Sequence, residues 1–192
     1  MYNNLKWHSP PTEWNVDGHR LYVVTGDKTD FWNRSFYGFT RTNGHLFYQN
    51  VEGDFSAEIT LHASFDTLYD QLGLMVRADD YTWLKTGLEY SDNRPQVSAV
   101  LTREGWSDWS TSAASDDDVI AGIRIRLTRH DDVLRVQKLH SSGEWQLIRL
   151  GYLNLPPMVQ VGLMCCSPER AGFEAEFSDF YLGDAIARDL HG

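Results

Sequence analysis

The sequence has few of the features that mark secreted or membrane-spanning proteins. Its 192 residues include only two cysteines, Cys165 and Cys166, and neighbouring cysteines form a strained disulfide and offer no metal knuckle. No apolar run approaches the ~18 residues that cross a bilayer. The N-terminal stretch MYNNLKWHSPP has neither the basic start nor the apolar run of a secretion signal. We therefore expect a cytoplasmic protein with reduced thiols and no membrane contact.

Positive charge and metal-binding patterns are also scarce. The chain has 17 Lys and Arg against 27 Asp and Glu, a net charge of −10, which repels phosphate backbones and argues against nucleic acid as a partner. The seven histidines lack zinc-like spacing, and neither a Gly-rich phosphate loop nor a GxSxG motif is present. We expect no cofactor and no catalytic metal, while the presence of a structural calcium stays open.

What the chain does contain is a series of short alternating segments separated by turn-forming Gly, Asn, Asp and Ser. These segments predict eleven strands: Leu21–Thr25, His45–Tyr48, Phe55–Ala63, Leu72–Arg77, Trp83–Tyr90, Val97–Thr102, Ile123–His130, Val133–Leu139, Trp145–Leu150, Val159–Cys165 and Phe173–Leu182. The predicted fold class is all-β, a two-sheet antiparallel jelly-roll sandwich in one domain over residues 1–183. Residues 184–192 form a short tail with a helical pattern, and the acidic stretch 115–118 reads as a solvated loop.

The alternation divides the strand residues into two faces. In YTWLKTGLEY, residues 81–90, Leu84 and Leu88 share one face, and Lys85 and Glu89 share the other. The predicted core between the sheets comprises Leu72, Leu74, Val76, Val97, Ala99, Leu101, Ile123, Ile125, Leu127, Val159, Val161 and Leu163. The opposite face comprises Gln71, Gly73, Met75, Arg77, Trp83, Lys85, Gly87, Glu89, Ser98, Thr102, Arg124, Arg126, Gln160, Gly162 and Met164.

This opposite face differs from an ordinary wet surface, which is rich in Lys and Glu and poor in aromatics and glycine. Gly73, Gly87 and Gly162 fall inside strands, where glycine often marks close approach by a ligand or by another backbone. We interpret the face as a shallow groove. The alternative is an exposed sheet on which Lys85 and Glu89 belong to cross-strand ion pairs.

Two aromatic stretches could wall such a groove: DFWNRSFYGF at 30–39 and GWSDWS at 105–110. Aromatic rings stack on the C–H faces of sugars while carboxylate, amide and guanidinium groups bind the hydroxyls, so this combination is typical of a carbohydrate site. The alternative is that these aromatics close the open ends of the sandwich.

With these motifs in place, the chain resembles the concanavalin A-like lectin/glucanase superfamily, and more closely a domain-of-unknown-function family related to the regulation of enolase protein. The resemblance spans roughly residues 5–182 and rests on TDFW (29–32), YGF (37–39), NGH (43–45), YDQLGLMVRADDYTWLKTGLEY (69–90), SDWS (107–110), CCSP (165–168) and GFEAEFSDFYL (172–182). It implies the fold and little about activity.

Glucanases of this superfamily carry a Glu-x-Asp-x-Glu motif on the concave sheet, and this chain has none. The nearest match, Glu174 and Glu176, is expected to face solvent on the outer sheet. An enzyme is therefore not the favoured interpretation.

The first hypothesis is a lectin-like module that binds a carbohydrate or a sugar-derived metabolite on the concave sheet. Its predicted ligand-binding residues are Gln71, Arg77, Trp83, Lys85, Glu89, His45, Asp70, Asp108 and Trp109. The tryptophans would stack, and His45 and Asp108 would act from the rim. The second hypothesis is a sugar-active hydrolase or lyase using Glu89 with Lys85, Asp70 or Asp108. The third is a regulatory module that binds a protein partner. The oligomeric state is left open.

Overall fold

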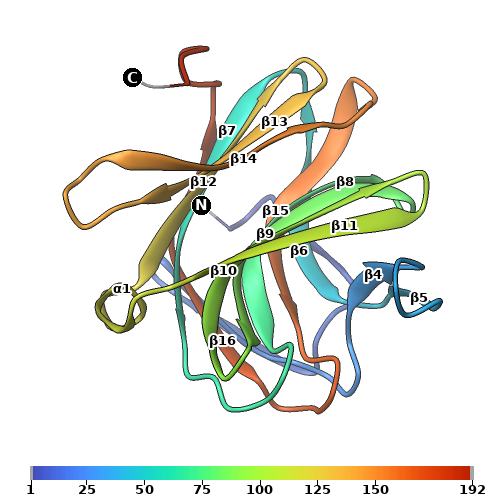
Figure 1. Ribbon diagram of the computed structural model, residues 1–192, viewed down its shortest axis with the longest axis vertical. Coiled ribbons are helices and arrows are strands. Elements are labelled where there is room, and N and C mark those ends of the chain that lie inside the picture. The colour runs from blue at the N-terminus through green and yellow to red at the C-terminus, as the bar shows by residue number, and fades with distance from the viewer. Residues whose placement is uncertain (1, 191–192) are drawn as a thin grey trace.

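The computed structural model describes residues 2–190 and contains two seven-stranded antiparallel sheets (Figure 1). The first sheet has the order β1 (Lys6–His8), β6 (His45–Glu52), β15 (Met158–Cys166), β8 (Gln71–Asp79), β9 (Thr82–Ser91), β10 (Arg94–Arg103), β11 (Trp106–Ala113). The second has the order β14 (Trp145–Tyr152), β13 (Val133–Leu139), β12 (Ile123–His130), β7 (Phe55–Ala63), β16 (Glu174–Gly183), β3 (Arg20–Val24), β2 (Glu13–Asp17). The predicted all-β, jelly-roll sandwich is confirmed.

The strands that the sequence did not predict are short or lie at sheet edges. They are β1, β2, β11 and the separate hairpin of β4 (Phe31–Asn33) and β5 (Thr40–Thr42). All five residues of β2 are exposed, and most of β11 is exposed too. A strand with no buried face has no reason to alternate, so its sequence carries no period-two signal.

Two local predictions were wrong. Residues 116–121, within and beyond the predicted acidic loop, form helix α1 (Asp116–Ala121), because the Ser115 side chain accepts a hydrogen bond from the Asp118 backbone N–H and three aspartates fill the first turn. The tail from Asp184 to Leu190 forms no helix. Residues 191 and 192 lie outside the described part of the chain.

The core between the sheets contains the aliphatic residues that the alternation assigned to it. Leu72, Leu74 and Val76 of β8 pack in one buried cluster with Ile123, Ile125 and Leu127 of β12. Glu174 and Glu176 lie on the opposite side of β16 from the buried Ala175 and Phe177, as predicted. Arg124 and Arg126 were placed on the wrong sheet: both belong to β12 and pair with Glu58 of the second sheet.

The other face of the first sheet, which bears Lys85 and Glu89, is called the site face below. Part of it is covered by the β4–β5 hairpin, drawn in blue beside the sheets in Figure 1. A second buried cluster lies beneath this cover: Phe31, Leu46, Tyr48, Met75, Trp83, Val100, Met164 and Cys166. Both cysteines are buried free thiols. Within residues 2–190, no helix is long and apolar enough to span a membrane.

The glycines of the site face serve backbone packing. A Cβ on Gly73 would lie 1.9 Å from the Thr86 carbonyl oxygen, and one on Gly87 would lie 2.0 Å from that of Leu72. These two glycines are opposite each other in the β8–β9 register. The sequence left two explanations for these glycines, close approach of a ligand or of another backbone, and the structure shows the second.

Gly87→Ala should therefore destabilise the fold by about 1–3 kcal/mol, because β8 and β9 must move apart to admit a methyl group. Urea denaturation measures the change. Gly26→Ala is the matched control, since its Cβ would meet its nearest neighbour, His45 Nε2, at an ordinary 3.5 Å. Equal stability of the two variants would contradict the close-approach explanation.

Candidate functional site

A cavity of about 140 Å³ opens on the site face where the hairpin, β9 and β11 meet. Its floor comes from β8 and β9, and its walls come from the hairpin, from β11 and from two loops. The lining residues are Asp30, Trp32, Tyr37, Phe39, Arg41, Tyr69, Gln71, Lys85, Glu89, Trp109, Pro168 and Glu169. The buried charged groups thus lie at the bottom and the aromatic rings at the sides.

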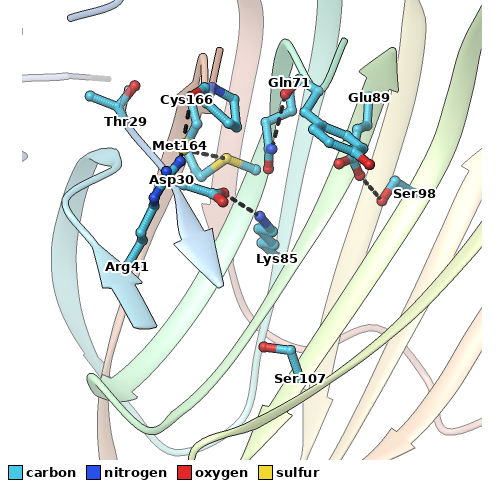
Figure 2. Close-up of polar contacts among 12 residues, drawn as sticks. Thr29, Asp30, Arg41, Gln71, Lys85, Glu89, Ser98, Ser107, Met164 and Cys166 are labelled. Carbon is cyan, nitrogen blue, oxygen red and sulfur yellow. Dashed lines mark hydrogen bonds and ion pairs between the residues drawn. The ribbon is translucent and has the colours of Figure 1, made fainter. Parts of the chain in front are cut away.

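The first charged element of the floor is an ion pair between a strand and the hairpin. Lys85 Nζ lies 3.3 Å from Asp30 Oδ1, and only 4% and 10% of the two side chains is exposed (Figure 2). Burial alone would lower the pKa of Lys85, but the carboxylates of Asp30 and Glu89 outweigh burial and raise it. Lys85 is therefore a firmly charged ammonium at neutral pH.

The second polar element of the floor is the Glu89 carboxyl group, two same-face positions further along β9, or about 13 Å along the strand. Its Oε2 accepts hydrogen bonds from Ser98 Oγ at 2.6 Å and from Trp109 Nε1 at 3.1 Å. Burial raises the pKa of Glu89, and the opposing effects of Lys85 and Ser98 do not cancel it. Among the described residues, no hydrogen bond is made to Oε1, which leaves that oxygen for a ligand.

The aromatic wall is a series of rings, most of which meet edge to face. Trp32 lies 6.4 Å from Trp109 at 87° and 5.8 Å from Tyr37 at 70°. Tyr69 lies 6.3 Å from Trp109 at 75°, and its hydroxyl is 2.8 Å from that of Tyr37. Phe39 stacks on Tyr37. Rings locked in this way present apolar faces with little freedom to collapse into the cavity.

The structure brings four of the predicted site residues to this cavity: Gln71, Lys85, Glu89 and Trp109. Gln71 and Glu89 are directly opposite in the β8–β9 register, and Trp109 reaches Glu89 from β11 across β10. The strand period predicted that Gln71, Lys85 and Glu89 share a face, and they do; Trp109 was expected to come from a loop and lies on strand β11.

Trp83 was predicted to stack on a ligand, and this is wrong. Its side chain is 0% exposed and lies 6.2 Å from the Phe31 ring, beneath the hairpin. The Lys85 ammonium lies 5.8 Å from its ring centre. Trp83 is thus a packing residue of the second buried cluster.

Asp108 and Asp70, the predicted loop acids, are also elsewhere. Asp108 has the opposite parity to Trp109 on β11 and pairs with Arg149 of the second sheet at 2.9 Å. Asp70 is completely buried and pairs with Arg170 at 2.5 Å. Neither carboxylate lines the cavity.

His45 and Arg77 have structural partners instead of rim positions. His45 Nε2 accepts a hydrogen bond from the Gly26 N–H at 2.9 Å, and its Nδ1 lies 2.6 Å from the Ser9 carbonyl oxygen. Burial lowers the pKa of His45, which suits a neutral ring that donates on one side and accepts on the other. Arg77 donates to Gln160 and pairs with Asp80.

The sequence reasoning missed part of the lining. The DFWNRSFYGF stretch, proposed as a wall, does supply Trp32, Tyr37 and Phe39, but its first residue, Asp30, was not recognised as the partner of Lys85. Arg41, Tyr69, Pro168 and Glu169 had no signal, because their positions depend on how loops from three parts of the chain fold together. Over residues 2–190, no three His, Cys, Asp or Glu side chains gather as a metal site would require.

Comparisons with known proteins agree with this architecture. Residues 7–185 match the family described as protein of unknown function DUF1349. The Saccharomyces cerevisiae protein named Regulation of enolase protein 1 is 37% identical over 185 residues, covering 96% of this chain and 92% of that protein. A crystal structure of a functionally unknown protein from the same yeast has a TM-score of 0.90 at 36% identity, covering 97% of this chain and 99% of that one.

A more distant structural neighbour is a GH43 protein from Bacillus licheniformis. Its TM-score is 0.73 at 14% identity, and the match covers 94% of this chain but 37% of that one. At this identity the likeness concerns the fold.

Lys85→Met should destabilise the protein by about 3–5 kcal/mol at pH 7, because Asp30 keeps a buried carboxylate without its cation. A lysine whose folded-state pKa is raised contributes stability that is complete below its ordinary pKa and is lost as the pH rises through the raised value. The loss in the variant should therefore be nearly constant from pH 6 to 9. Urea denaturation across that range measures it.

Glu89→Gln is the matched control at the same floor. Its amide retains an oxygen acceptor for Ser98 and Trp109, and it removes a carboxyl whose ionisation burial opposes. We expect a change below about 1 kcal/mol at pH 7. A Lys85→Met variant as stable as Glu89→Gln would show that the ion pair does not hold the hairpin.

Proposed function

Because the chain belongs to the DUF1349 family, whose function is unknown, we propose from its own geometry that residues 1–183 form one module that binds a carbohydrate or a sugar-derived metabolite. The cavity of Lys85 and Glu89 is the proposed site. The observation that carries the proposal is the combination of a buried charged floor with a wall of interlocked aromatic rings.

A sugar suits the two kinds of lining. Its C–H faces can lie against Trp32 and Trp109, while its hydroxyls can donate to Asp30 and accept from Lys85. Only one donor direction of Lys85 is used by Asp30 in the described structure, so an ammonium N–H is available to a hydroxyl oxygen. A purely apolar ligand would leave these buried charges unmatched.

The charge balance of the cavity favours a ligand with little net charge. Asp30 and Glu169 are matched in number by Lys85 and by Arg41, which lies over the Phe39 ring, and burial favours the neutral form of Glu89. The volume of about 140 Å³ is below the ~300–1,000 Å³ of pockets for drug-sized ligands. Both observations support a small neutral ring compound.

We also place the protein in the cytoplasm as part of this proposal. Support comes from the two buried free thiols, since secreted sandwiches of this size tend to use cysteines in disulfides. The net charge of −10 supports a partner other than nucleic acid.

The second candidate function is a sugar-active hydrolase or lyase. It is favoured by the presence of two carboxyls in one cavity in different environments, Asp30 held by Lys85 and Glu89 with a pKa raised by burial. Such a pair can divide acid and base roles. Asp30 here takes the place of the loop acids Asp70 and Asp108. A regulatory protein-interaction role has support from Phe36, 96% exposed at the turn of the hairpin.

Trp109→Ala should weaken sugar binding by about 10- to 100-fold, because it removes one ring face and a donor to Glu89. Isothermal titration with a panel of pentoses, hexoses, amino sugars and uronic acids measures the affinity. Trp106→Ala is the matched control: Trp106 lies on the same strand, is 58% exposed and is not part of the cavity lining. It should bind within about twofold of the parent. An absence of binding across the panel would refute the proposed function.

The hydrolase candidate predicts turnover that depends on both carboxyls. Nitrophenyl glycosides of the sugars that bind are incubated with the parent, Asp30→Asn and Glu89→Gln, and nitrophenol release is followed. For a pure binding module we expect no release above the buffer rate by any of the three. Release by the parent that falls at least ~10³-fold in both variants would favour the enzyme.

A further inference from the structure

The site face is blocked on one side of the cavity by the hairpin. Phe31 is fully buried and packs edge-on against Trp83 at 6.2 Å. The contact is tight on the other side as well, because a Cβ on Gly44 would lie 2.3 Å from the Phe31 ring and 2.6 Å from Cys166 Sγ. No space is left between the hairpin and the sheet at this point.

The open cavity and the second buried cluster meet between two neighbouring same-face positions of strand β9. Along the site face of β9, Glu89 and Lys85 line the cavity. Trp83, the next same-face residue, is instead buried beneath Phe31 of the hairpin. Two neighbouring residues at the start of the hairpin lie on either side of the same boundary: Asp30 pairs with Lys85 at the cavity, and Phe31 belongs to the buried cluster. Figure 2 shows the ion pair between Asp30 and Lys85.

The hairpin is attached to the sheet at its far end too. The Asn33 N–H donates to Ser107 Oγ at 2.9 Å, and Asn33 Nδ2 donates to the Asp80 carbonyl oxygen at 2.7 Å. Ser107 in turn is 2.7 Å from Thr102 Oγ1. These bonds tie β4 to the β8–β9 turn and to the β10–β11 pair, so the hairpin is a fixed part of the fold.

We propose, resting on the proposed function, that the cavity is an end-on site, which accepts a free single-ring sugar or the terminal ring of a glycan and excludes the internal rings of a chain. A chain lying across the sheet would have to pass through the position of Phe31. A terminal ring can reach Lys85 and Glu89 with the rest of the glycan leaving through the mouth, past Tyr37, Phe39 and the exposed Glu169.

Chain length distinguishes an end-on cavity from an open groove. In a groove, each further ring finds its own stacking surface and raises the affinity, as successive bases do on aromatic platforms. Here a second or third ring projects into solvent and gains little. The affinity of the parent protein should therefore be almost independent of length.

The test uses titration calorimetry with three matched series: D-glucose and cellotetraose, D-xylose and xylotetraose, D-mannose and mannotetraose. In a series that binds, we expect the tetramer and the monomer to differ by less than about threefold. A tetramer that binds more than tenfold more tightly than its monomer would overturn the end-on proposal and leave sugar binding intact. If no compound of any series binds, the end-on proposal fails, and the wider sugar panel described above decides separately whether the proposed function fails with it.

A variant adds an independent check. Phe31→Ala removes the side chain that fills the position through which a chain would have to pass, so tetramers should gain at least tenfold over monomers in the variant but not in the parent. Thermal unfolding first establishes that the variant is folded. If it is not, the length series on the parent protein still decides. If the folded variant binds tetramers and monomers with similar affinity, as the parent does, then Phe31 is not the residue that closes the cavity.

Discussion

The ion pair between Lys85 and Asp30 is the contact on which the site depends. It joins the middle of β9 to the start of the hairpin across an almost dry boundary. Removing two charges from water is costly, and their attraction in a low-dielectric setting only offsets that cost when the geometry is good. The pair is therefore weak evidence for stability and stronger evidence for position. The hairpin is held in one place, because any other position would leave a buried charge without a partner.

The position of the hairpin then gives the three residues of β4 two different environments, one buried against the sheet and one open to the cavity. Strand β4 alternates, with Phe31 and Asn33 buried toward the sheet and Trp32 partly open. Phe31 completes the second apolar cluster, Asn33 ties the strand to the β8–β9 turn, and Trp32 faces the cavity. A very short strand thus seals one part of the site face and walls the other, and the size of the cavity follows from where the seal ends.

The sequence predicted what depends on repetition and failed where the answer depends on one contact between distant segments. The alternation in β8, β9 and β15 repeats often enough to assign the core and to put Lys85 and Glu89 on one face. The same alternation could not distinguish Trp83 from Lys85, because parity assigns a face and says nothing about what covers it. The position of Asp108 was predicted wrongly because the exposed residues 106–113 carry no strand signal, so the opposite faces of Asp108 and Trp109 on β11 were not foreseen. Asp30 was missed because its partner is 55 residues away.

The two carboxyls of the cavity differ in a way that bears on the ligand. Asp30 is held by an ammonium group, whereas burial raises the pKa of Glu89 and favours its neutral form. An ionised carboxylate only accepts hydrogen bonds, and a protonated carboxyl also donates. With Lys85 as a further donor, the floor offers acceptors and donors within one small space. A hydroxyl both donates and accepts, so a polyol can satisfy such a floor, whereas an anion would leave the acceptors unmatched and a cation would face Lys85.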